Sequence, residues 1–192
     1  MTDIEARARA AFDAAHAADP EREGPRAAEA AYAERIEAWV RRLCPAPSLA
    51  LRLAALGQHL ERWAIARAEF PPGRGGSLRW RSAVQERQGR RARELVAAAG
   101  GEEELGARVA RLVAKAAPRG DAEAQALEDA ACLVFLETEL AAFQREHDRA
   151  KVVDILQKTW RKMSAPAQEL ALTLALPAES RELLHAALTP NQ

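Results

Sequence analysis

Residues 56–81 read LGQHLERWAIARAEFPPGRGGSLRWR and contain the only long Pro/Gly-rich break in a chain with otherwise helical patterning. The break at 70–76 cannot continue a helix, because proline fixes the backbone and glycine frees it in non-helical ways. The stretch also holds one of the four histidines and two of the four tryptophans, each beside an arginine. It therefore predicts a junction between two helices and places a candidate site there.

Outward from this junction, apolar residues recur at helical spacing, and no segment shows the strict alternation of a half-buried strand. With 192 residues and 48% hydrophobic content, the chain can bury about two-thirds of its unfolded surface in one core. We expect an all-α fold, a single domain over residues 1–192, with the C-terminal helices at 165–188 packed on the core. The bundle should contain about eight or nine helices, near 3–17, 25–43, 49–66, 77–99, 102–116, 121–147, 148–163, 165–174 and 178–188.

The net charge is zero, with 28 basic and 28 acidic residues, so no global field steers the chain toward nucleic acid or an anionic membrane. Two stretches are locally one-signed: residues 74–93 carry seven arginines against one acid, and residues 121–139 carry six acids and no base. If the two stretches pack against each other, their opposite charges compensate, which would explain both charge runs. Nucleic acid is not favoured as a partner, because the basic helix has no interleaved aromatic residue beyond Trp80.

The N-terminal residues mix acids with arginines and lack the apolar core of a signal peptide, and no apolar run approaches the length of a membrane span. We therefore expect a cytoplasmic protein with no membrane partner. The sequence leaves the oligomeric state open.

The candidate catalytic residues are His59, Glu128 and Asp129, and Arg62 lies near His59. Asp129 shares an apolar stripe with the leucines that follow it, so it should point inward and needs a cation or a hydrogen-bond donor. Histidine and inward carboxylates are ligands for a divalent metal, and arginines suit phosphate groups. The alternative is structural: Asp129 pairs with an arginine of the basic helix, and His59 is a satisfied core histidine.

The candidate ligand-binding residues are Arg62, Trp63, Arg79, Trp80 and Arg81, because a guanidinium group stacked on an indole can form a platform for a flat or anionic ligand. The alternative is that these tryptophans belong to the core and their basic neighbours reach water along them. The other histidines, 16, 147 and 185, have no motif context and are expected at the surface.

Several blocks together resemble the uncharacterised domain-of-unknown-function family numbered 4202. They are FDAAHAADP (12–20), AYAERIEAWVRRLCPAPS (31–48), LGQHLERW (56–63), LRWR (78–81), AQALEDAACLVFLE (124–137) and DILQKTWRKMS (154–164). Their order is also distantly similar to the HD-domain phosphohydrolases, all-α metalloenzymes that cleave phosphate esters.

The HD resemblance implies an incomplete metal centre. His59 falls at the histidine of the HD pair, Leu60 replaces the paired aspartate, and Gln88 replaces a further histidine. The last ligand would be Asp129, although the register can place Ala131 there instead. A divalent metal held by His59 and Asp129 therefore remains only an open alternative.

Three functions follow from these patterns. The first is a degenerate HD-like domain that binds a phosphorylated or anionic small molecule, with Arg62, Arg79 and Arg81 as anion contacts. The second is a metal-dependent phosphohydrolase with a non-standard ligand set built on His59 and the two carboxylates. The third is a non-enzymatic protein-interaction module anchored by tryptophan and arginine, the commonest hot-spot residues.

Overall fold

The computed structural model describes residues 3–189, and it confirms the all-α prediction. Within these residues the helices are α1 (Asp3–Ala17), α2 (Ala28–Leu43), α3 (Leu49–Leu56), α4 (Gly73–Ala98), α5 (Glu103–Val113), α6 (Ala122–Val134), α7 (Leu140–Glu146), α8 (Arg149–Lys162), α9 (Ala165–Leu172) and α10 (Ala178–Leu188). Short 3-10 turns η1 (Arg62–Ala64) and η2 (Arg67–Glu69) follow α3, and a π-helical turn, η3 (Phe135–Glu139), separates α6 from α7. The strands β1 (Arg22–Glu23) and β2 (Arg26–Ala27) form a small antiparallel hairpin before α2.

The chain divides between Ala124 and Gln125 into two compact units, which we name unit 1 and unit 2 in chain order. The single domain expected for residues 1–192 stays a prediction. Among residues 3–189, no helix has both the length and the apolar character that a membrane span requires.

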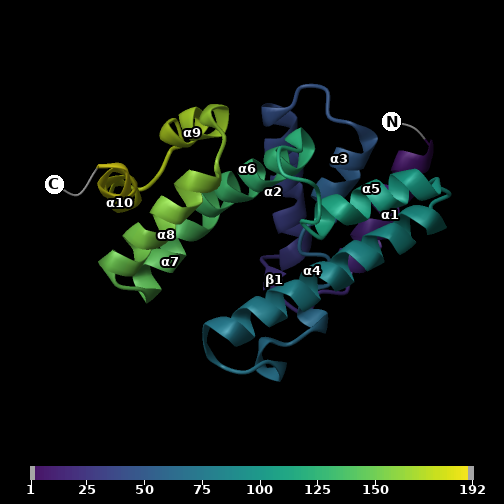
Figure 1. The fold of residues 1–192 in the computed structure, drawn as a ribbon, viewed down its shortest axis with the longest axis horizontal. Coiled ribbons are helices and arrows are strands. Elements are labelled where there is room, and N and C mark those ends of the chain that lie inside the picture. The colour runs from purple at the N-terminus through teal and green to yellow at the C-terminus, as the bar shows by residue number, and fades with distance from the viewer. Residues whose placement is uncertain (1–2, 190–192) are drawn as a thin grey trace. The chain divides into compact units, whose positions relative to one another are not determined.

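Unit 1 is built around α3, which packs against α1, α2 and α5, and α4 lies beside α5 (Figure 1). The central place of α3 agrees with its sequence, which is apolar on nearly every face. Its core contains the fully buried side chains of Phe12, Ile36, Leu53 and Leu60. These contacts fix the C-terminal end of α3, where the candidate site begins.

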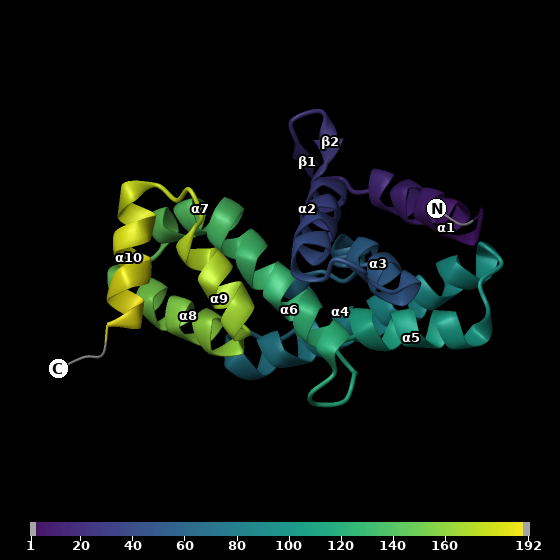
Figure 2. The same cartoon turned by 90° about the horizontal axis from the view of Figure 1, so that it is seen from above.

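Unit 2 packs α8 against α10 (Figure 2). Its core contains Leu133, Leu136, Leu140 and Leu156. The helix predicted over 121–147 is present but is interrupted by η3, which raises the number of α-helices in residues 3–189 to ten. Inside this interruption the Thr138 hydroxyl donates to the Val134 carbonyl at 2.9 Å. Hydroxyl bonds of this kind often accompany a local distortion of a helix.

The helix predicted over 49–66 is too long, because α3 ends at Leu56. Ser48 caps its start as its residue type suggests, accepting from the Leu51 amide at 3.1 Å. At the other end, the Gln58 side chain donates to the Ala54 carbonyl at 3.2 Å, and a His16 ring nitrogen lies 2.8 Å from the Leu56 carbonyl oxygen. These bonds satisfy carbonyls that a continuing helix would have used.

The lack of motif context predicted that His16 lies at the surface, and this prediction is wrong. His16 is 1% exposed, and its Nε2 donates to the last carbonyl of α3. His147 is half-buried and stacks on Phe143 at 4.1 Å, whereas His185 is exposed as expected.

Two other helix starts differ from the prediction. Helix α2 begins at Ala28 and not at Pro25, because residues 22–27 turn into the hairpin. Helix α4 begins at Gly73 and not after Ser77, and Pro72 precedes its first residue. The Ser77 hydroxyl donates to the Gly73 carbonyl at 3.1 Å inside the first turn, so it does not cap the helix.

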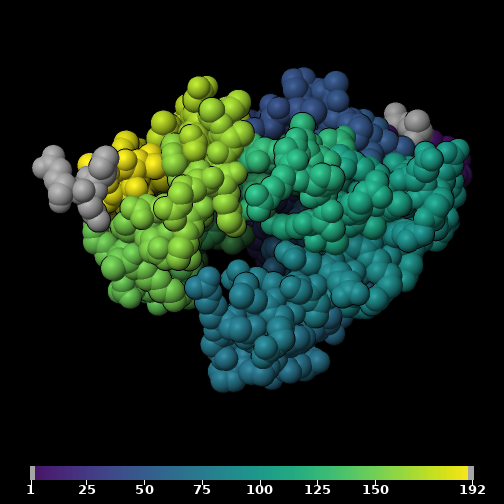
Figure 3. Space-filling model, in the orientation of Figure 1, coloured from purple at the N-terminus to yellow at the C-terminus, as the bar shows by residue number. Residues whose placement is uncertain are grey.

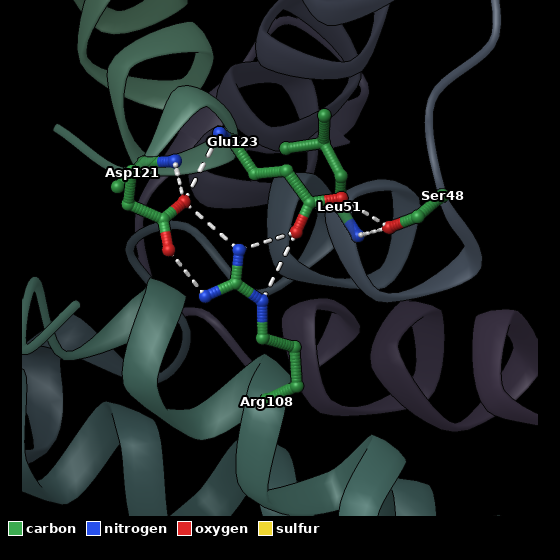
Figure 4. A network of polar contacts seen from close by, with 6 residues as sticks. Ser48, Leu51, Arg108, Asp121 and Glu123 are labelled. Carbon is green, nitrogen blue, oxygen red and sulfur yellow. Dashed lines mark hydrogen bonds and ion pairs between the residues drawn. The ribbon is translucent and has the colours of Figure 1, made fainter. Parts of the chain in front are cut away.

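Within unit 1, Arg108 of α5 is hydrogen-bonded to the two acids around the first residue of α6, Asp121 and Glu123 (Figure 4). Its guanidinium donates to both carboxylate oxygens of Asp121, at 2.6 and 2.8 Å, and to Glu123 at 2.5 and 3.0 Å. The hydroxyl of Ser48 also donates to Glu123. The hydrogen bonds from Arg108 and from the Ala124 amide hold the pKa of Asp121 well below its usual range.

Candidate functional site

The backbone after α3 adopts a left-handed conformation, which residues other than glycine rarely take. His59 and Glu61 have φ angles of 58° and 48°, in the left-handed region. Such residues cost about 1–3 kcal/mol each and persist only where their surroundings enforce them. The segment between α3 and α4 is therefore held in shape by its side-chain contacts.

Glu61 provides one of these contacts. Its carboxylate accepts from Arg87 at 2.5 Å and from Arg91 at 2.9 Å, which joins the segment to the middle of α4. The hydrogen bond that Arg91 donates to Glu61 raises the pKa of Arg91. Part of the positive charge of α4 is therefore compensated inside unit 1, by Glu61 and by the pair between Arg93 and Glu103.

His59 has defined partners on both ring nitrogens and on one ring face. Its Nδ1 lies 3.1 Å from Glu29 Oε2, and its Nε2 lies 3.1 Å from Arg62 Nη1. Tyr32, one turn after Glu29 on α2, stacks on the imidazole with centroids 3.9 Å apart and planes within 2°. The ring is thus fixed in position and orientation by α2 on one side and by Arg62 on the other.

Arg62 continues this chain of contacts to α4. Its guanidinium carbon lies 4.9 Å from the centroid of the Trp80 ring, within the range of a cation–π interaction. The Trp80 Nε1–H donates to the Ile65 carbonyl at 2.9 Å, which fixes the indole. The structure therefore brings together His59, Arg62 and Trp80 of the predicted site, all in unit 1.

The remaining predicted ligand contacts lie around Trp80. Arg79 and Arg81 are exposed, and within residues 3–189 neither forms an ion pair. Trp63 is half-buried, as is Trp80. In Figure 3 the segment from η1 into α4, blue-teal in the colour bar, gathers at the lower edge of unit 1. These side chains are accessible to a ligand or a partner.

Glu128 and Asp129 belong to unit 2 and have partners there. Asp129 is 3% exposed, which confirms that it points inward. It accepts from the Ser164 amide at 2.8 Å, from the Ser164 hydroxyl at 2.6 Å and from Gln125 at 2.9 Å. Glu128 forms an ion pair with Lys162 at 3.2 Å. Asp129 is thus satisfied by donors and not by an arginine of α4, and a joint site of Asp129 with His59 stays a prediction.

These residues do not fit the divalent metal that the HD resemblance implies. Among the described residues, no three His, Cys, Asp or Glu side chains gather in an arrangement that could hold a metal ion. Both nitrogens of His59 are engaged by Glu29 and Arg62, and an Arg N–H occupies the lone pair that a metal would need. The carboxylate of Asp129 is likewise occupied by three donors.

A cavity of about 580 Å³ lies elsewhere in unit 1, between α1, the hairpin and α2. It is lined by both signs of charge, and two of its ion pairs join Arg9 to Glu37 and Arg26 to Glu34. Burial alone would raise the pKa of Glu37, but the hydrogen bonds from Arg9 and Arg41 outweigh it and lower the pKa. None of the predicted site residues lines this cavity.

Sequence reasoning did not assign Glu29 or Tyr32 a role beside His59. They lie 30 and 27 residues before His59, on a different helix, and no motif joins them to it. Their spacing of three residues on α2 was the one available signal, because residues i and i+3 share a helix face.

A family model described as Domain of unknown function (DUF4202) matches residues 6–184 of this chain. The chain belongs to this family. The DUF4202 match spans both units and includes each predicted site residue, so the resemblance found in the sequence blocks is confirmed. No curated protein and no solved structure matches the chain.

Proposed function

We propose that this protein is a degenerate HD-like domain in the cytoplasm and that it binds a phosphorylated or otherwise anionic small molecule. The binding residues are Arg62, Arg79, Arg81 and Trp80, on the segment between α3 and α4 and the first turns of α4. Neither a resident metal nor turnover is part of this proposal.

The observation that carries the proposal is the environment of Arg62. Its Nη1 lies 3.1 Å from His59 Nε2, and its guanidinium carbon lies 4.9 Å from the centroid of the Trp80 ring, so neither neighbour is a carboxylate. A carboxylate partner would have neutralised the cation, whereas a ring nitrogen and an indole face fix its position and supply no negative charge. A fixed guanidinium of this kind is suited to bind an anion with little loss of entropy on binding.

The surrounding charge favours the same ligand class. Residues 62–81 contain five arginines and one acid, Glu69, so this segment has a net charge of plus four. Within residues 3–189, none of these five arginines (62, 67, 74, 79 and 81) forms an ion pair with a carboxylate. Glu69 accepts from the Ala66 amide at 3.0 Å inside its own turn. An anion would meet an uncompensated field here.

The protein-interaction module is a second candidate because of the apolar surface beside these arginines. Trp63 and Trp80 are half-buried and Leu78 is 52% exposed. Fully buried tryptophans would have removed the anchors that this function requires. A partner protein would use the same surface, so the two candidates are separated by whether small anions bind.

The test is a thermal-shift screen with inorganic phosphate, pyrophosphate, nucleotides and sugar phosphates. A ligand present at one hundred times its Kd stabilises the folded state by about 2.7 kcal/mol. For a chain of this size we expect that Tm rises by about 5–10 °C. The variant Arg62→Met should lose most of this shift, because it removes the oriented cation.

Arg90→Met is the matched control. Arg90 is exposed on the same helix, and it has no ion-pair partner among the described residues. Its substitution should leave the shift unchanged. If no member of the screen stabilises the wild-type protein, the proposed function is wrong. If Arg62→Met and Arg90→Met lose equal parts of the shift, binding follows general charge and not this site.

A further inference from the structure

The hydrogen-bond partners of His59 indicate which of its ring nitrogens accepts and which donates. Arginine has only N–H donors, so the 3.1 Å contact between Arg62 Nη1 and His59 Nε2 requires a lone pair on Nε2. The proton of the neutral ring must then sit on Nδ1, where it donates to Glu29 Oε2 at 3.1 Å. The other tautomer, or the imidazolium, would place two N–H groups against each other.

Arg62 offers a specific edge once this bond is made. Only Nη1 is hydrogen-bonded, whereas Nε and Nη2 have no partner among residues 3–189. The Trp80 ring covers one face of the group, so its contact and the His59 bond together orient the guanidinium plane. The Nε–Nη2 edge carries two parallel N–H donors, which match two oxygens of one carboxylate or phosphate group.

We infer that Glu29 and His59 are positioning residues for this edge. Glu29 selects the His59 tautomer that accepts from Arg62, and Arg62 then presents its Nε–Nη2 edge to an oxyanion that binds through two oxygens. This inference rests on the proposed function and extends it in two ways. It assigns roles to Glu29 and Tyr32, and it specifies side-on, bidentate recognition.

The environment of the ring supports a positioning role. Tyr32 stacks on the imidazole within 2° of parallel, which prevents the ring from turning away from either partner. Glu29 is itself fixed, because its backbone amide donates to the buried Asp19 at 2.9 Å. The left-handed backbone at His59 directs the side chain toward α2, and a residue kept in that conformation indicates a selected geometry.

The first measurement is the tautomer of His59 by nitrogen-15 NMR of the imidazole in the full-length protein. We expect a protonated Nδ1 and an unprotonated Nε2. In Glu29→Met, which removes the acceptor, this preference should weaken or invert. Glu29→Gln keeps a neutral acceptor and should restore the wild-type tautomer in part.

The second measurement is the affinity for inorganic phosphate and for acetate by titration of each variant. Glu29→Met should weaken binding by about tenfold, the effect of one lost hydrogen bond of about 1.4 kcal/mol. Glu29→Gln should lose less. His59→Gln can donate to Glu29 and accept from Arg62, so it should bind more tightly than His59→Phe. Phosphate and acetate distinguish a phosphoryl ligand from a carboxylate.

Glu34→Met is the control, because Glu34 lies on the same helix and pairs with the exposed Arg26. The affinity of the Glu34→Met variant for phosphate and acetate should equal that of the wild-type protein. A His59 proton on Nε2, or equal affinities for Glu29→Met and Glu34→Met, would overturn the inference and leave anion binding by Arg62 intact. A complete absence of Arg62-dependent anion binding would instead refute the proposed function, whatever the tautomer.

Discussion

Arg108→Met should lower the free energy of unfolding of unit 1, because Arg108 connects α5 to the start of α6 through two carboxylates. Its guanidinium makes four hydrogen bonds, two to Asp121 and two to Glu123. Methionine keeps most of the apolar stem and removes every donor. The substitution therefore tests the charged interactions with little change in packing.

The magnitude follows from the exposure of the three side chains, which is 25% for Arg108, 13% for Asp121 and 26% for Glu123. Exposed ion pairs contribute about 0–1 kcal/mol, and breaking a buried pair costs about 3–5 kcal/mol. This bidentate cluster is largely but not fully buried. We therefore expect a loss of about 2 kcal/mol in the free energy of unfolding at pH 7.

The pH dependence has a definite sign. Arg108 lowers the pKa of Asp121 in the folded protein below its value in the unfolded chain, which is about 3.9. The ionised carboxylate therefore stabilises the folded state above about pH 4, and this contribution is lost as the pH falls toward the folded-state pKa. The difference in stability between wild type and Arg108→Met should shrink between about pH 5 and pH 3.

The assay is urea unfolding of both proteins at several pH values from 7 to about 3, monitored by circular dichroism. Arg111→Met, an exposed change on the same helix, serves as control and should stay within about 0.5 kcal/mol of wild type. A loss for Arg108→Met no larger than that of the control would refute the reasoning. A loss of 2 kcal/mol that does not change with pH would show that Asp121 is not responsible.

Three further predictions concern other parts of the chain. Gly57→Ala should destabilise unit 1 by about 1–3 kcal/mol in thermal unfolding, because the new Cβ would lie 2.8 Å from Val113 Cγ2. The control Gly75→Ala places its Cβ with no atom within 4 Å, and it should stabilise the helix by up to about 1 kcal/mol. Asp129→Asn should cost about 2 kcal/mol and accelerate hydrogen exchange at the Ser164 amide, while Glu128→Gln leaves that amide protected. Trp80→Phe removes the hydrogen bond to the Ile65 carbonyl but keeps an aromatic ring for Arg62. Hydrogen exchange of the backbone amides in residues 62–72 should therefore rise while anion binding is retained, and unchanged exchange would show that Trp80 does not hold this segment.

Much of the fold could be predicted because helix signals are local. Apolar spacing located every helix, and the prolines and glycines that punctuate the sequence placed most ends within a few residues. The clearest error was α3, which ends at Leu56 although the apolar pattern continues. Its end depends on His16, a residue 40 positions earlier whose ring nitrogen reaches the Leu56 carbonyl.

The candidate site divides in the same way. The stretch 56–81 by itself indicated His59, Arg62 and Trp80, because histidine and tryptophan are rare in this chain and all three residues lie around its main break. It could not indicate Glu29 or Tyr32, and it suggested a cation or donor for Asp129 without naming Ser164. Hydrogen-bond partners on different helices depend on how those helices pack, and one sequence carries no pattern for that.

The amino-acid sequence alone thus determined the helical class, the excess of positive charge over residues 74–93 and the inward direction of Asp129, since these follow from periodicity and composition along one element. Only the tertiary structure decided which tautomer His59 adopts and which edge of Arg62 stays open. The reason is that both depend on an acceptor from α2 and a ring from α4, and only packing brings those groups within hydrogen-bonding or stacking distance.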